Sequence, residues 1–166
     1  MLFRSNLSPL DSLLKECVTA SPEELHRLVL SASKIGVSQE IERMLPDFVS
    51  NRRTAAVRVL LSAGIPINAR GELGATALHW ACWKGYAELA QVLLEHGASL
   101  TEEDGQFHGT PAGWFEHGVG NCHEGGGDYA EVARLLITTG AVIPKFRIPT
   151  GRADVDTVLR EHKLLE

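Results

Sequence analysis

The sequence has few of the features that mark secreted or membrane-embedded proteins. It contains three cysteines, Cys17, Cys82 and Cys122. An odd number of widely spaced cysteines argues against a disulfide framework and favours a reducing compartment. No apolar run approaches the roughly 20 residues of a membrane span. The N-terminus lacks the apolar core and cleavage site of a signal peptide. We therefore expect a cytoplasmic protein.

Basic charge and catalytic motifs are also scarce. Lys and Arg total 16 against 21 Asp and Glu, giving a net charge of -5, so no global positive field attracts nucleic acid or an anionic membrane. The sequence has no P-loop, GxSxG, HExxH or GxGxxG motif. We expect no cofactor, no nucleic-acid or membrane partner and no enzymatic activity. With 44% hydrophobic residues, the chain has the composition of one globular domain.

What the sequence does contain is a repeat. Residues 87–98 read AELAQVLLEHGA and residues 130–141 read AEVARLLITTGA, and the two segments are identical at half of their positions. A weaker copy, TAAVRVLLSAGI, occupies residues 54–65. Self-similarity at a period of this length indicates a stacked-repeat protein. Such stacks usually serve as binding surfaces.

The clearest repeat unit, residues 74–100, contains two short helical patterns. Apolar residues fall at i, i+3 and i+4 in both: Leu78, Ala81 and Cys82 in the first, and Leu89, Val92 and Leu93 in the second. Gly85 suits the turn between the helices, Gly97 the end of the second helix, and Thr76 the cap of the first. Two such helices need neighbours on both sides to bury their apolar faces.

These residues resemble the ankyrin-repeat family. The segment TALHWACWKGY, followed by LAQVLLEHGA, is similar to the family pattern nearly position for position, with Ala77 replacing the usual proline. The segment GTPAGWFEHG at residues 109–118, with the polar insert that follows, resembles a bacterial subtype of ankyrin proteins. The resemblance implies an all-α solenoid of about four helix-turn-helix repeats, with hairpin loops between repeats and degenerate caps at both ends.

Extending the register divides one domain, residues 1–166, into approximate units. The repeats are 8–40, 41–73, 74–104 and 105–148, with an insertion at 119–128 and a C-terminal capping helix at 152–165. Ser21, Pro22 and Glu24 form a capping-box pattern. Pro46 is expected to start or kink a helix.

The family resemblance also implies where a partner would bind. Hairpin tips carry Glu72, Leu73 and Ala75 in one repeat and Gln106 and Phe107 in the next, and the inner helices carry Trp83, Lys84 and His117. Exposed aromatic residues often dominate binding energy, so we expect Trp83 and Phe107 to be the main anchors. The function implied is a non-enzymatic, monomeric protein-binding module. Acidic loop residues favour a basic or mixed partner surface: Glu72, Glu102, Glu103 and Asp104.

Trp80 and Trp114 occupy equivalent positions in successive repeats. They would form either an aromatic platform for a ligand or inter-repeat core, and their size favours the core. His79, by the family resemblance, ties down the neighbouring hairpin. Gly113 replaces it in the next repeat.

An alternative function is a small-molecule or metal-binding protein that uses the insertion at 119–128. The candidate metal ligands are His108, His117, Cys122 and His123, although their spacing matches no standard zinc template. A third interpretation is an enzyme that uses Cys122, His117 or Glu116.

Overall fold

The computed structural model describes residues 19–35, 38–122, 126–144 and 149–165. Within these ranges the regular structure is helical, apart from isolated bridge residues: Arg70 pairs with Thr76, and Leu165 is also a bridge residue. The helices are α2 (Pro22–Ile35), α3 (Ser38–Glu42), α4 (Met44–Ser50), α5 (Thr54–Ser62), η1 (Glu72–Gly74), α6 (Ala77–Lys84), α7 (Ala87–Glu95), α8 (Pro111–Asn121), α9 (Tyr129–Thr138) and α10 (Ala153–Glu161).

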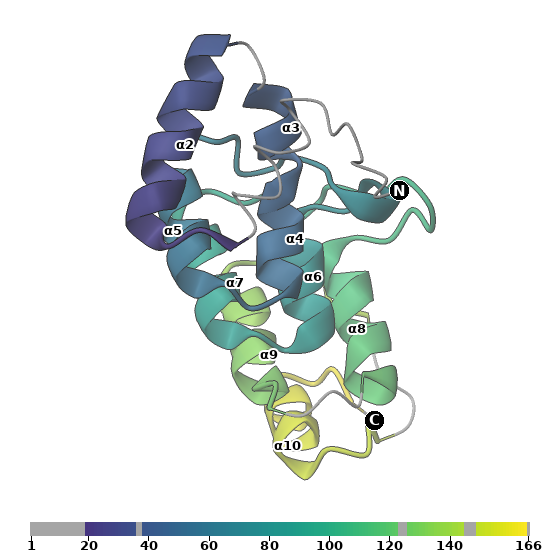
Figure 1. The fold of residues 1–166 in the computed structure, drawn as a ribbon. Coiled ribbons are helices and arrows are strands. Elements are labelled where there is room, and N and C mark those ends of the chain that lie inside the picture. Colours follow the sequence, from purple (N-terminus) through teal and green to yellow (C-terminus); the bar gives the residue numbers. More distant parts are fainter. Residues whose placement is uncertain (1–18, 36–37, 123–125, 145–148, 166) are drawn as a thin grey trace, which may run out of the picture.

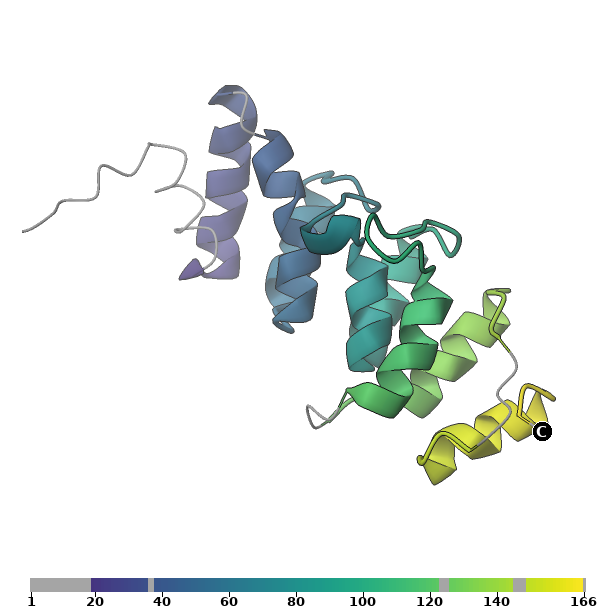
Figure 2. The same ribbon diagram turned by 90° about the vertical axis from the view of Figure 1, so that its right-hand side faces the viewer.

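The helices form two stacked rows, as the repeat pattern predicts. Helix α6 contacts α4 and α8 in an inner row, and α2, α5, α7 and α9 form an outer row beside them. Helix α10 packs against α9 at one end of the stack (Figure 1). The loops that precede α6 and α8 project to the same side of the inner row, as the turned view shows (Figure 2). This arrangement confirms the predicted all-α solenoid.

The outer helices end in the same way in successive repeats. After α7, the N–H of Gly97 donates to Leu94 O at 2.9 Å and the N–H of Ala98 donates to Leu93 O at 3.0 Å. Equivalent bonds follow α5 and α9, and the three glycines at this position have φ of 82–84°. A left-handed residue is needed to close this type of helix end, so glycine recurs with the repeat.

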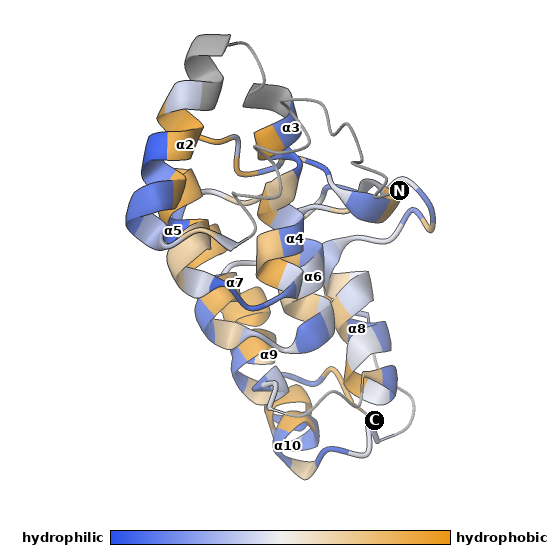
Figure 3. Ribbon diagram, viewed as in Figure 1, coloured by the Kyte–Doolittle hydropathy of each residue, from blue (hydrophilic) through white to orange (hydrophobic). Residues whose placement is uncertain are grey.

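Amphipathic helices explain the stacking. The apolar residues predicted to share a face in α6 and α7 are all 3% exposed or less. Figure 3 shows polar residues on the outward side of α2 and apolar residues on its side toward the stack. The buried side chains of neighbouring helices form one continuous core. Each helix pair is therefore stabilised mainly by its neighbours, as in other solenoids.

The predicted start of α2 is also confirmed. The Ser21 N–H donates to Glu24 Oε2 at 3.0 Å, and the Glu24 N–H donates to Ser21 Oγ at 3.3 Å. These reciprocal bonds are a capping box. Pro46 lies in the first turn of α4, where the helix does not need its missing N–H.

Three predicted boundaries need correction. The division between 40 and 41 falls inside α3. The first three residues of the predicted insertion continue α8, because Val119 is buried against the core and extends the helix by part of a turn. The capping helix is 153–161 rather than 152–165, because Lys163 has a φ of 59° and its N–H bonds back to Arg160 O. The first helix predicted for repeat 8–40 lies mostly outside the described residues.

Candidate functional site

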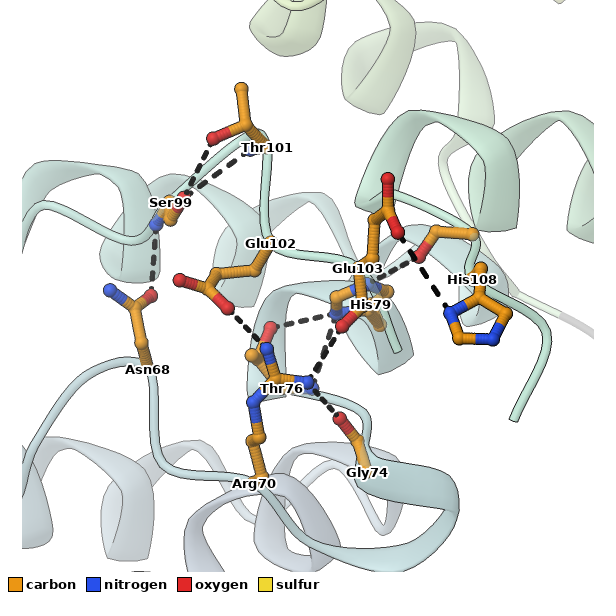
Figure 4. Close-up of polar contacts among 11 residues, drawn as sticks. Asn68, Arg70, Gly74, Thr76, His79, Ser99, Thr101, Glu102, Glu103 and His108 are labelled. Atoms are coloured by element: carbon orange, nitrogen blue, oxygen red, sulfur yellow. Dashed lines mark hydrogen bonds and ion pairs between the residues drawn. The ribbon is translucent and has the colours of Figure 1, made fainter. Parts of the chain in front are cut away.

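Polar contacts join successive hairpins into one rim (Figure 4). Arg70 Nη1 donates to Gly74 O at 2.8 Å and to Glu103 O at 2.6 Å, and Arg70 Nη2 pairs with the Glu102 carboxylate. Nearby, the Ser99 N–H donates to Asn68 Oδ1 at 2.9 Å. Residues about 30 positions apart are thereby held together, so the hairpins have a fixed spacing.

His79 supports this rim from below. Its Nδ1 accepts from the Thr76 N–H at 3.1 Å, and its Nε2 lies 3.0 Å from Gly109 O. Burial lowers the pKa of His79, and the contact with Gly109 O opposes that shift. A neutral ring with its proton on Nε2 satisfies both contacts. His79 has the structural role that the family resemblance implies.

Asp104 organises the second hairpin. Its Oδ1 accepts from the N–H groups of Gln106 (2.8 Å) and Phe107 (2.6 Å), and its Oδ2 accepts from the Gly109 N–H and Trp114 Nε1, both at 2.9 Å. Burial alone would raise the pKa of Asp104, but these four bonds hold it below its ordinary value. The side chain is 1% exposed. The prediction that Asp104 is an acidic contact for a partner is therefore wrong.

An apolar groove opens between the rim and the inner helices. We call it the aromatic groove. Its volume is about 620 Å³, and its lining consists of Leu73, Trp80, Trp83, Phe107, Gly109, Gly113, Trp114 and His117. A concave, mostly apolar surface of this size is typical of a binding site.

Trp114 is the centre of the aromatic groove. Its ring meets those of Trp80, Trp83 and His79 edge-on, with centroids 5.1, 6.0 and 5.3 Å away. His117 stacks on Trp83 with centroids 5.3 Å apart. The hydrogen bond that the Trp114 indole N–H donates to Asp104 fixes the central ring, so the hairpin and the groove wall form one unit.

The structure brings four predicted binding residues together. Leu73, Trp83, Phe107 and His117 line the aromatic groove, and the Phe107 side chain is 65% exposed. Three other predicted binding residues are each adjacent in sequence to a lining residue. Of these, Glu72 and Gln106 are exposed, and Lys84 is half-buried. Ala75 does not belong to this surface, because it is fully buried beneath the hairpin.

The two equivalent tryptophans differ in burial. Trp114 is 7% exposed and forms inter-repeat packing, as the core interpretation expects. Trp80 is half-buried and lies at the groove surface. Its indole N–H is covered and has no hydrogen-bond partner among the described residues.

The predicted metal ligands do not gather in the described part of the chain. His108 and His117 are exposed on the hairpin and on α8, whereas Cys122 is buried after the end of α8. No group of three or more His, Cys, Asp or Glu side chains is placed to hold a metal in the described residues. His123 lies outside them. Cys82 and Cys122 are free, buried thiols.

Sequence reasoning missed the contacts that bring α8 to its neighbours. A Cβ added to Gly118 would overlap Trp83 O and lie 2.9 Å from Trp83 Cα. Arg152 donates from Nε to Val119 O and from Nη2 to Cys122 O, both at 3.0 Å. Gly118, which follows His117 in the sequence, could have indicated close packing. No spacing rule would have found Arg152.

The fold agrees with comparisons to known proteins. A family described as "Ankyrin repeats (3 copies)" matches residues 21–104, just over half of the chain. This protein belongs to the ankyrin-repeat family. Ankyrin repeats generally mediate protein–protein interaction, and no described helix is long and apolar enough to cross a membrane.

Several curated proteins are similar over part of the chain. A putative ankyrin repeat protein of Rickettsia bellii is 40% identical over 83 residues, which is 48% of this chain and 35% of that protein. Palmitoyltransferase AKR1 of Lachancea kluyveri is 46% identical over 57 residues, covering 34% of this chain and 8% of the relative. Ankyrin repeat and KH domain-containing protein mask-1 of Caenorhabditis elegans is 31% identical over 119 residues, which cover 60% of this chain and 4% of that protein. The chain spans about a third or less of these relatives.

Proposed function

We propose that this protein is a non-enzymatic binding module whose partner protein docks on the aromatic groove and the adjoining hairpin tips. The observation that carries the proposal is the set of aromatic side chains that meet there. Trp83 and Phe107 reach the groove from different repeats, and Phe107 is one of the exposed large hydrophobic side chains. Buried aromatic anchors commonly supply most of the energy of an interface.

The rigidity of the rim supports the same function. Arg70, His79 and Asp104 fix the two hairpins through contacts to backbone groups. A surface that is already ordered loses less conformational entropy on association. We infer that the partner meets a preformed concave surface and that the protein acts as a monomer in the cytoplasm.

The test is affinity capture from a lysate of the source cells. Wild type is compared with a Trp83→Ala/Phe107→Ala variant and with a Leu30→Ala/Val142→Ala control. The control residues are also exposed, at 49% and 88%, but they lie outside the groove. Thermal melting establishes that each variant is folded.

We expect one protein to be recovered by wild type and by the control but lost from the folded groove variant. Truncation of two anchors should weaken binding by more than about 2 kcal/mol, enough to remove a micromolar partner from the eluate. Equal recovery by all three proteins would place the site elsewhere on the molecule.

A further inference from the structure

The walls of the aromatic groove determine what kind of side chain it can bind. The Trp114 indole N–H is used by Asp104, and the Trp80 indole N–H is covered. The remaining polar side-chain atoms of the lining are Trp83 Nε1 and the two ring nitrogens of His117. A ligand would be held mainly by the aromatic rings of the groove.

Two exposed carboxylates lie next in sequence to residues that line the groove. Glu72 precedes the lining residue Leu73 and is exposed, and Glu116 precedes the lining residue His117 and is exposed. Asp47, on the neighbouring helix α4, faces Glu72: burial and then the like charge of Glu72 raise the pKa of Asp47. Neither Glu72 nor Glu116 forms an ion pair with another described residue.

Positive charge near the groove is more limited. Lys84 follows Trp83 and is half-buried, and His108 lies 3.9 Å from the Glu103 carboxylate. Arg70 is engaged by Glu102 and by two backbone carbonyls. The groove thus combines an uncharged aromatic interior with an acidic rim.

We propose that the aromatic groove accepts an arginine side chain from an extended segment of the partner protein, with the guanidinium against the tryptophan rings and its charge facing the rim carboxylates. This inference rests on the proposed function and names the chemistry of the partner. Cations within about 6 Å of an aromatic centroid are attracted by the ring quadrupole, most strongly by Trp.

Arginine fits this groove better than lysine. An ammonium group is compact and strongly hydrated, so it needs acceptors to replace its lost water. The lining offers few acceptors. A guanidinium is planar and weakly hydrated, so its face can lie on an aromatic ring while its edge remains available to carboxylates such as Glu72.

The test uses three synthetic peptides with the full chain. Each has a Gly/Ser background and one central residue, which is arginine, lysine or citrulline; citrulline has nearly the shape of arginine without its charge. Binding is followed by tryptophan fluorescence and by two-dimensional NMR. We expect the arginine peptide to bind at least about fivefold more tightly than either of the others, from a cation–π contribution of about 1 kcal/mol.

Variants separate the rings from the rim. Trp83→Leu and Phe107→Leu keep apolar side chains but remove the aromatic faces, and each should weaken arginine binding by about fivefold or more. Phe107→Leu should leave the protein folded, because the Phe107 side chain is mostly exposed, so it tests the aromatic contribution even if Trp83→Leu unfolds the protein. Glu72→Gln should weaken binding, whereas Glu161→Gln, the same change on exposed α10, should leave it unchanged.

Equal affinities for the arginine and citrulline peptides would overturn the inference, as would tighter binding of the lysine peptide or no binding of any peptide at millimolar concentration. Such results would leave the capture experiment unaffected. A partner lost from the folded Trp83→Ala/Phe107→Ala variant would still establish the groove as its binding site.

Discussion

The Asp104 side chain turns back into its own hairpin, where three backbone N–H groups and the Trp114 indole N–H donate to it. A buried carboxylate is stable only when such donors replace its lost water. In this position it controls both the path of residues 106–109 and the orientation of the central groove ring. The same contacts make its ionised form part of the folded state.

Asp104→Asn should therefore destabilise the protein. One of the two acceptor oxygens becomes an NH₂ group that faces N–H donors, and we expect a loss of about 2–3 kcal/mol in the free energy of unfolding. Urea denaturation followed by circular dichroism measures this loss. A variant as stable as wild type would show that the hairpin does not depend on the carboxylate.

The pH dependence follows from the lowered pKa of Asp104 in the folded state. The unfolded chain binds a proton near the ordinary Asp value of about 4, so the stabilisation is fully present above that pH and is lost as the pH falls toward the folded pKa. The difference in stability between wild type and Asp104→Asn should therefore shrink below about pH 4. A constant difference from pH 7 to pH 3 would contradict this.

The sequence predicted the aromatic residues of the surface but not the role of Asp104. Trp83 and Phe107 could be placed because each has a fixed register position in a repeat. An acidic residue followed by glycine in a polar loop looks like a solvated turn residue. Local hydrogen bonding to donors two and three residues later is a known property of Asp in turns, but the contact with Trp114 depends on the stacking of the next helix.

At the scale of the helices, α8 packs closely on α6 where Gly118 faces the backbone of Trp83. Gly118 lies against the Trp83 main chain, on the α6 segment that carries a groove ring. Tyr129 Oη donates to Trp83 O at 2.6 Å, so the same carbonyl is also contacted from α9. The separation of the two inner helices, and with it the width of the aromatic groove, depends on this contact.

Gly118→Ala should force α6 and α8 apart. Overpacking at a site with no space costs about 1–3 kcal/mol, which is measured as a lower urea midpoint. Gly120→Ala on the same helix is the matched control, because a Cβ there meets nothing within 4 Å. Since Ala favours helices over Gly, the control should gain about 0.5–1 kcal/mol. Two variants of equal stability would disprove the close contact.

At the scale of the whole molecule, the stack has one continuous core with Cys82 fully buried in its middle repeat. Burial raises the pKa of the Cys82 thiol, and alkylation requires an accessible thiolate. Cys82 therefore reports on opening of the central repeat rather than on surface motion.

We expect iodoacetamide to modify Cys82 only as the stack unfolds. Alkylation of Cys82 is measured by peptide mass spectrometry at increasing urea concentrations. Its midpoint should equal that of the unfolding transition followed by circular dichroism. Cys17→Ser/Cys122→Ser background variants remove the other thiols. Rapid labelling of Cys82 in the absence of urea would mean that the middle repeat opens independently.

The sequence could predict those parts of the fold that follow its repeat periodicity. The i, i+3, i+4 pattern and the recurring glycine after each outer helix determined the helix pairs, because stacking requires both in every unit. Periodicity carries no information where the repeat is broken. The extension of α8 through Asn121 depends instead on the burial of Val119 and on contacts from Arg152, and α10 ends early because Lys163 is left-handed.

The insertion follows α8 at the end opposite the hairpin rim, about 16 Å away along an eleven-residue helix. Its last described residues return to the stack, where the Asp128 N–H donates to Gly85 O at 2.8 Å. The chain therefore leaves and rejoins the stack at the edge opposite the hairpin rim, and the groove residues keep their positions in the repeat. This edge is a suitable position for grafting an affinity tag or a fluorescent reporter, because a change there leaves the aromatic groove as it is.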